Sequence, residues 1–143
     1  MRSQPDDVVA VQLLAILNDA DAPEGDQLDA AMDLEDHSGA WFEQEIFKIL
    51  RREQFESVLA QHCAESLAGI WARQGRIDQG FFPELHGPAL REVLGILGAR
   101  APHLIPAGTG EDWRSFLQQP GSHQGLLELA CSLIYLRRLR TSF

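Results

Sequence analysis

Residues 54–102 read QFESVLAQHCAESLAGIWARQGRIDQGFFPELHGPALREVLGILGARAP. In the first part of this stretch, apolar side chains recur at steps of three and four residues, which is the spacing of one face of an α-helix. They are Phe55, Val58, Leu59, Cys63, Leu67, Ile70 and Trp71. The spacing predicts one long helix over Gln54–Gln74 that buries a single face and organises the rest of the chain.

Glycine and proline mark the ends of this helix and of the next one. Gly75 follows the last periodic residue, where glycine lets the chain turn through the left-handed region. After a short helical segment over residues 81–85, Gly87-Pro88 opens another helix, because proline is pre-set for the first helical turn. The apolar stripe of that helix is Leu90, Val93, Leu94, Leu97 and Ala101. Pro102 ends it, and the short connections predict that the two helices pack as an antiparallel pair.

The N-terminal part of the chain predicts further helices. Ser3 resembles the cap of a helix that runs to Leu17 with Val9, Leu13 and Ile16 on its inner face, and the alternative is a β-strand at residues 8–11. A short helix is expected over Gln27–Asp36. A strongly apolar helix then begins after the cap Ser38 and breaks near residues 51–53. Its inward residues are Trp41, Phe42, Ile46, Ile49 and Leu50.

The C-terminal part predicts a loop and two more helices. Residues 103–110 contain proline and glycine and are expected to form the loop. One helix carries Trp113, and the last one begins after Ser122 and ends in an arginine cluster that complements its carbonyl end. The tryptophans lie on apolar stripes and are expected in the core. They are Trp41, Trp71 and Trp113.

The central stretch also resembles a known family. The matching segments are LAQHCAESLAGIWARQGRID at 59–78, FFPEL at 81–85, GPALREVLGIL at 87–97 and ARAPHL at 99–104. The core of the match is Ala64, Glu65, Ser66, Leu67, Ile70, Trp71, Gly75, Asp78 and Arg91-Glu92-Val93. These segments, about a third of the chain, are similar to small HEAT-like helical proteins of bacteria. Some members of that group are immunity partners of secreted antibacterial toxins, so the resemblance implies helical hairpins and a toxin-neutralising function.

Charge is unevenly distributed along the chain. Residues 1–72 hold 15 acidic and 4 basic side chains, whereas residues 73–143 hold 6 and 8. From Asp6 to Asp36 there are ten acidic residues and no lysine or arginine. Such a segment is either a solvated acidic face or a surface that attracts a basic protein and repels nucleic acid. The residues expected to contact the partner are Asp26, Asp29, Asp33, Glu35 and Asp36.

Motifs for catalysis, metal binding or cofactor binding do not emerge from the residue spacing. The histidines show no zinc-ligand spacing and no cysteine pair accompanies them. Cys63 and Cys131 lie at apolar helical positions, where buried reduced thiols are expected. No apolar run approaches the roughly 18 residues that span a bilayer, and the N-terminus lacks the basic region of a secretory signal, which favours the cytoplasm.

These observations predict an all-α single domain over residues 1–143, with about seven helices packed as HEAT-like antiparallel hairpins. The predicted function is that of a non-enzymatic immunity protein, without metal or cofactor, that neutralises a cognate toxin through its acidic helical surface. The alternative is a secretion chaperone or adaptor that binds a basic protein partner. An enzyme would require carboxylate pairs that the sequence cannot place together.

Overall fold

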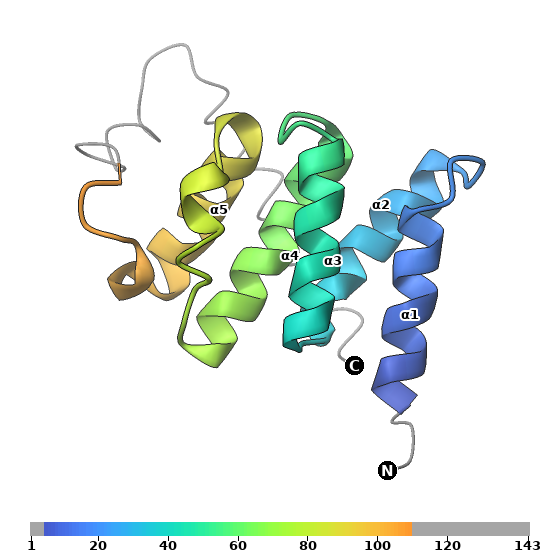
Figure 1. Cartoon of the computed structure of the whole chain (residues 1–143), viewed down its shortest axis with the longest axis horizontal. Coiled ribbons are helices and arrows are strands. Elements are labelled where there is room, and N and C mark those ends of the chain that lie inside the picture. Colours follow the sequence, from blue (N-terminus) through green and yellow to red (C-terminus); the bar gives the residue numbers. More distant parts are fainter. Residues whose placement is uncertain (1–4, 110–143) are drawn as a thin grey trace. The chain divides into compact units, whose positions relative to one another are not determined.

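The computed structural model describes residues 5–109, and the part up to Pro106 forms one compact unit. This unit consists of α-helices joined by turns and short 3₁₀ helices, without a strand among the described residues (Figure 1). The elements are α1 Pro5–Leu17, α2 Glu24–Asp33, η1 Leu34–Asp36, α3 Ala40–Arg52, α4 Val58–Gln74, η2 Phe82–Glu84, α5 Gly87–Arg100 and η3 Pro102–Leu104. The all-α prediction is confirmed for this part. The two helices expected at the C-terminus lie outside the described residues, and a single domain over residues 1–143 stays a prediction.

Helix α4 is the centre of the unit. It contacts α2, α3 and η1 and has its most extensive interface with α5, and Figure 1 shows it in green between α3 and α5. From Cys63 to Trp71 every residue of α4 is buried. The prediction of a single buried face was therefore wrong. The reason is that Ala64, Ala68 and Gly69 are small and let neighbouring helices approach on sides where the sequence shows no large apolar residue.

The start of α4 lies later than predicted, at Val58. Ser57 caps the helix, since its Oγ accepts a hydrogen bond of 3.0 Å from the backbone N–H of Ala60. The preceding residues Gln54 and Phe55 have φ angles of 56° and 61°, a left-handed conformation that ends α3 and redirects the chain. The predicted break between the two helices is confirmed, and Phe55 is buried from the turn instead of from the helix.

The glycine and proline signals of the sequence are confirmed at three helix ends. Gly75 follows α4 with a φ of 76°, and its N–H donates to the carbonyl of Trp71. Helix α5 opens at Gly87-Pro88. Its end is also as expected, because Ala101, before Pro102, leaves the helical region with φ −153° and ψ 61°.

Helix α1 buries Leu13 as predicted, but its packed face is rotated from the predicted one. Its buried residues are Ala10, Leu13, Leu14 and Leu17, whereas Val9 is 43% exposed and Ile16 is half-buried. Helix α2 begins at Glu24, three residues before the predicted start, and buries Ala30 and Ala31. Together α1 and α2 form a hairpin whose second helix packs on α4.

A buried hydrogen bond joins α4 to α3 in the core of the unit. Trp71 is 0% exposed, and its indole Nε1–H donates a hydrogen bond of 2.8 Å to the Glu43 carboxylate in the first turn of α3. Next to this pair, the rings of Phe47 and Phe81 stack with their centroids 3.8 Å apart. The prediction that Trp71 lies in the core is confirmed, and the Glu43 carboxylate becomes a buried structural acceptor.

Trp41 was wrongly predicted to lie in the core, since it is 45% exposed. The reason lies at the start of α3, where the N-cap is Gly39 with a φ of 125° and Ser38 makes no capping hydrogen bond. Trp41 stands at the second position of the helix and rests edge-on against Phe42. Trp113 lies outside the described residues.

Cys63 is fully buried and free, as predicted. Burial raises the pKa of its thiol to about 12, because the thiolate would lose its hydration inside the core. Cys131 lies outside the described residues. Among the helices that the structure describes, none is long and apolar enough to cross a membrane.

Candidate protein-binding surface

Four aspartates form a continuous stripe along α2 and η1. Asp26, Asp29, Asp33 and Asp36 follow one another at steps of three, four and three residues, and all four are exposed. This spacing places them on one side of the helix, beside the face that buries Ala30, Ala31 and Leu34 in the core. We call these four residues the acidic stripe.

The acidic stripe places carboxylates three or four residues apart along α2 and η1. Like charges three or four residues apart on a helix destabilise it by about 0.2–0.5 kcal/mol per pair. The stripe contains three such pairs, and α2 has no basic residue in its last turn. A row of exposed carboxylates presents a negative potential to neighbouring molecules.

Glu35, also predicted to contact the partner, lies on the other side of η1. Its carboxylate packs over Gly69 of α4 and lies 3.6 Å from the guanidinium of Arg100 at the end of α5. Its backbone carbonyl accepts a hydrogen bond from Arg73, which also donates to the carbonyl of His37. Glu35 therefore joins η1 to α4 and α5. The structure brings the other four predicted residues together and separates this one from them.

Arg73 has a different role from the one that its position in the sequence suggests. It lies in the last turn of α4, a position where a cation can complement the carbonyl end of its own helix. Its guanidinium instead reaches the carbonyls that end η1. The helix that carries the acidic stripe is thus fixed at its C-terminal end by a charge from α4.

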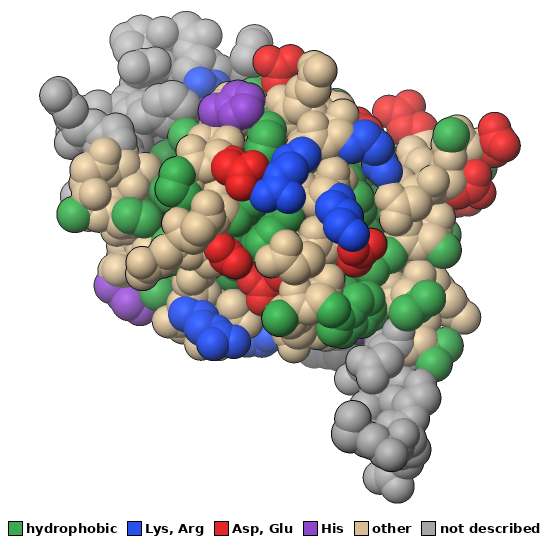
Figure 2. All heavy atoms as spheres, viewed as in Figure 1, with side chains coloured by type: hydrophobic (Ala, Val, Ile, Leu, Met, Phe, Trp, Pro, Cys, Tyr) green, Lys and Arg blue, Asp and Glu red, His purple; other side chains and the backbone are tan. Residues whose placement is uncertain are grey.

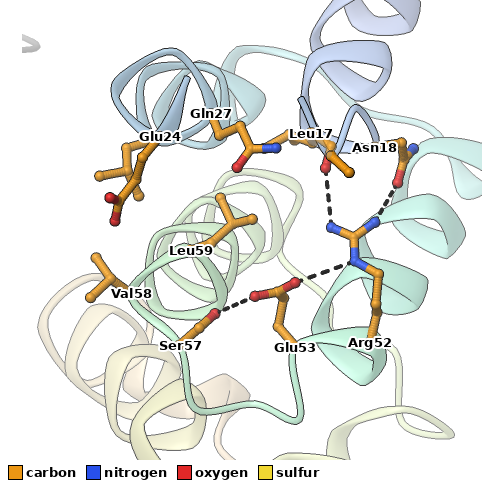
Figure 3. Close-up of a pocket in the computed structure, with 11 residues that line it drawn as sticks. Leu17, Asn18, Glu24, Gln27, Arg52, Glu53, Ser57, Val58 and Leu59 are labelled. Carbon is orange, nitrogen blue, oxygen red and sulfur yellow. Dashed lines mark hydrogen bonds and ion pairs between the residues drawn. The ribbon is translucent and has the colours of Figure 1, made fainter. Parts of the chain in front are cut away.

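A second feature of this region is a groove with a volume of about 540 Å³. It lies where the loop after α1 and the start of α2 meet the turn between α3 and α4 (Figure 3). Its polar lining is Asn18, Glu24, Gln27, Arg52, Glu53 and Ser57, and its apolar lining includes Leu17, Leu28, Val58 and Leu59. We call it the α2–α4 groove. The face of α2 that lines this groove carries Glu24, Gln27 and Leu28. It differs from the face that carries the acidic stripe.

Arg52 holds one wall of the groove together. Its guanidinium donates to the carbonyl of Leu17 at 3.1 Å, to Asn18 Oδ1 at 2.7 Å and to Glu53 Oε2 at 3.3 Å (Figure 3). The other oxygen of Glu53 accepts a hydrogen bond of 2.7 Å from Ser57, the cap of α4. This chain of bonds ties the end of α1 to the end of α3 and the start of α4, so the groove wall is preorganised.

Acidic side chains dominate the surroundings of the groove. Figure 2 shows them over the loop between α1 and α2, where Asp19 and Asp21 are exposed beside Glu24. The turn before α4 adds Glu56. Among the described residues that line the groove, Arg52 is the only basic one, and Glu53 lies against it.

Sequence reasoning did not identify the groove. Its lining joins residues 17–28 to residues 52–59. These segments are brought together only by the packing of α1 and α2 against α3 and α4. Ser57 offered a signal, because serine is a preferred helix cap. The apolar spacing around Phe55 and Val58 obscured that signal by predicting that the helix had already begun.

Among the residues that the structure describes, no three histidine, cysteine or carboxylate side chains meet as metal ligands. Comparison of the chain with models of protein families, with curated proteins and with solved structures gave no match.

Proposed function

We propose that this protein is a non-enzymatic binding protein that recognises a basic protein partner through the acidic stripe on α2 and η1. The observation that carries the proposal is the exposure of four aspartates on one side of a single helical segment. Matched potentials accelerate encounter and select among partners, and a fixed row of carboxylates provides such a potential. In this proposal the function is binding, and the protein needs no metal or cofactor for it.

The proposed biological role is that of a cytoplasmic immunity protein, built of about seven helices in HEAT-like hairpins, that occludes the active site or an essential surface of a cognate toxin. The resemblance of residues 59–104 to bacterial HEAT-like proteins supports this role. Further support comes from the acidic stripe, because a basic toxin surface would be drawn to it.

The test is co-expression with the product of the adjacent gene, followed by purification of the complex and assay of the partner's toxic activity. We expect a stable complex in which that activity is lost. Asp26→Asn with Asp36→Asn should weaken the complex, because neither aspartate has an interaction within the described part that the substitution would break. A partner that is bound equally well by this double variant would contradict recognition through the stripe.

The exposed apolar surface of α1 favours a second candidate, a secretion chaperone or adaptor. Val8, Val9 and Val11 are each more than two-fifths exposed, and Figure 2 shows apolar side chains along this helix. Chaperones that hold unfolded segments use such surfaces. Binding to a short unfolded segment of the partner, with the partner's folded activity unchanged, would favour this candidate over immunity.

A further inference from the structure

We propose that the α2–α4 groove receives one arginine side chain of the basic partner and is the anchor point of the complex. The inference rests on the proposed function in one respect, the basic character of the partner. The groove and the acidic stripe are on different faces of α2, so each can be tested without the other. Arginine is among the residues that most often provide binding energy when they insert into a pocket.

The orientation of Gln27 makes the groove a hydrogen-bond acceptor. The amide nitrogen of this side chain donates to the carbonyl of Asp19 at 2.8 Å and to that of Ile16 at 3.4 Å. Because both partners are carbonyl oxygens, the nitrogen must face them, and the amide oxygen must face the other way. Figure 3 shows this oxygen turned toward the groove. It is a fixed, neutral acceptor for an N–H donor.

Glu24 supplies the negative charge. Its carboxylate borders the groove from the first turn of α2, on the side opposite Arg52, and Figure 3 shows it directed toward Val58. Glu53 contributes a second carboxylate, which is already shared between Arg52 and Ser57. A planar guanidinium has five N–H donors in a fixed fork and suits a site with two acceptors, whereas the ammonium of lysine is a point charge.

The apolar wall fits the stem of the same side chain. Leu28 and Leu59 are half-buried in the lining, and Val58 at the rim is 51% exposed. An arginine stem is a chain of methylene groups that lies favourably on such a surface while its head stays polar. The groove therefore offers both parts of an arginine a matching environment.

The rival occupant is an anion bound to Arg52, and the geometry disfavours it. The Arg52 guanidinium already donates to three acceptors and lies against the Glu53 carboxylate. The groove is bordered by the N-terminal ends of α2 and α4 and by the C-terminal ends of α1 and α3, so the helix dipoles oppose one another. Among the described residues of the lining, Glu24 is a carboxylate without an ion pair, and its charge selects a cation.

The experiment is an NMR titration of the full ¹⁵N-labelled chain with the blocked tripeptide acetyl-Ala-Arg-Ala-amide. The matched control replaces arginine by citrulline, which has nearly the same shape and no charge. We expect saturable shifts of the amides of Glu24, Gln27 and Leu59 and of the Gln27 side-chain amide, with a dissociation constant on the order of 1 mM. The citrulline peptide should bind about tenfold more weakly.

Two variants separate this inference from the proposed function. Glu24→Gln should reduce arginine-peptide affinity about tenfold, since it removes the charge and keeps the size. Asp26→Asn with Asp36→Asn should leave the groove shifts unchanged. Shifts confined to the acidic stripe, equal shifts with citrulline, or no saturable shift in the groove would each overturn the anchor while leaving recognition through the stripe intact.

Discussion

The hydrogen bond between Trp71 and Glu43 predicts a specific loss of stability when the indole N–H is removed. Trp71→Phe keeps an aromatic ring in a site that is 0% exposed, but it takes the donor from a carboxylate held 2.8 Å away. A buried hydrogen bond to a charged group contributes about 1.5–3 kcal/mol. The smaller ring adds about 1 kcal/mol for lost contacts. We therefore expect a destabilisation of about 3 kcal/mol.

The matched substitution is Glu43→Gln, which keeps an oxygen acceptor for the indole and should cost about 1 kcal/mol. The double variant completes a thermodynamic cycle. Because the two residues interact directly, the destabilisation of the double variant should differ from the sum of the two single destabilisations by about 1 kcal/mol or more. The assay is urea unfolding followed by circular dichroism, with the free energy of unfolding extrapolated linearly to water.

Two results would refute this reasoning. If the destabilisation of the double variant equals the sum of the two single destabilisations to within about 0.5 kcal/mol, Trp71 and Glu43 do not stabilise one another in solution. If Trp71→Ala, which should cost about 3–5 kcal/mol, leaves the melting temperature unchanged, α4 is not the centre of the fold.

The remaining predictions concern the packing around α4. Gly69→Ala should destabilise the protein by about 1–2 kcal/mol, because a Cβ there overlaps the Glu35 carboxylate, and Glu35→Ala should restore part of the loss in the same urea assay. Ser57→Ala should cost about 1 kcal/mol, whereas Ser57→Thr, which also caps helices and keeps the hydroxyl that donates to Glu53, should cost less in thermal unfolding. Cys63 has a raised pKa in the folded state, so its contribution to stability is present below the unfolded thiol pKa of about 8.5 and is lost as pH rises from there toward about 12. Mass spectrometry should find Cys63 unmodified by iodoacetamide at pH 8 in the native protein and alkylated in urea, and rapid native alkylation would show that the thiol is accessible.

The helix ends could be predicted from the sequence because their signals are local. Gly75, Gly87-Pro88 and Pro102 act through the allowed angles of one or two residues, and no distant contact is needed to interpret them. The buried faces of the helices were harder to predict. In α4, alanines and a glycine create contact surfaces that apolar periodicity does not register, and at Trp41 a large apolar residue on the predicted stripe remains outside the core.

The candidate site also has one part that could be predicted from the sequence and other parts that could not. The stripe of Asp26, Asp29, Asp33 and Asp36 could be predicted because its members share one helical segment. Glu35 could not be separated from them, since its position depends on Gly69 and on arginines from two other helices. The α2–α4 groove could not be predicted at all, because it exists only where α1 and α2 pack against α3 and α4.

The central claim is that the acidic stripe recognises a basic protein, and association kinetics with the adjacent gene product test it most directly. Stopped-flow rates would be measured at about 0.01 M salt, where the Debye length is about 30 Å, and at about 0.15 M, where it is about 8 Å. The variants are Asp26→Asn with Asp36→Asn, and the control Glu45→Gln with Asp78→Asn, which changes net charge equally but lies on α3 and in the loop after α4, where Asn can still accept the hydrogen bond from the Phe81 N–H.

The account predicts that the wild-type rate falls with salt and that the stripe variant associates more slowly at low salt with a weaker salt dependence. The control variant should remain close to wild type. Equal rates for the stripe and control variants, or a wild-type rate that salt does not change, would contradict recognition through the acidic stripe.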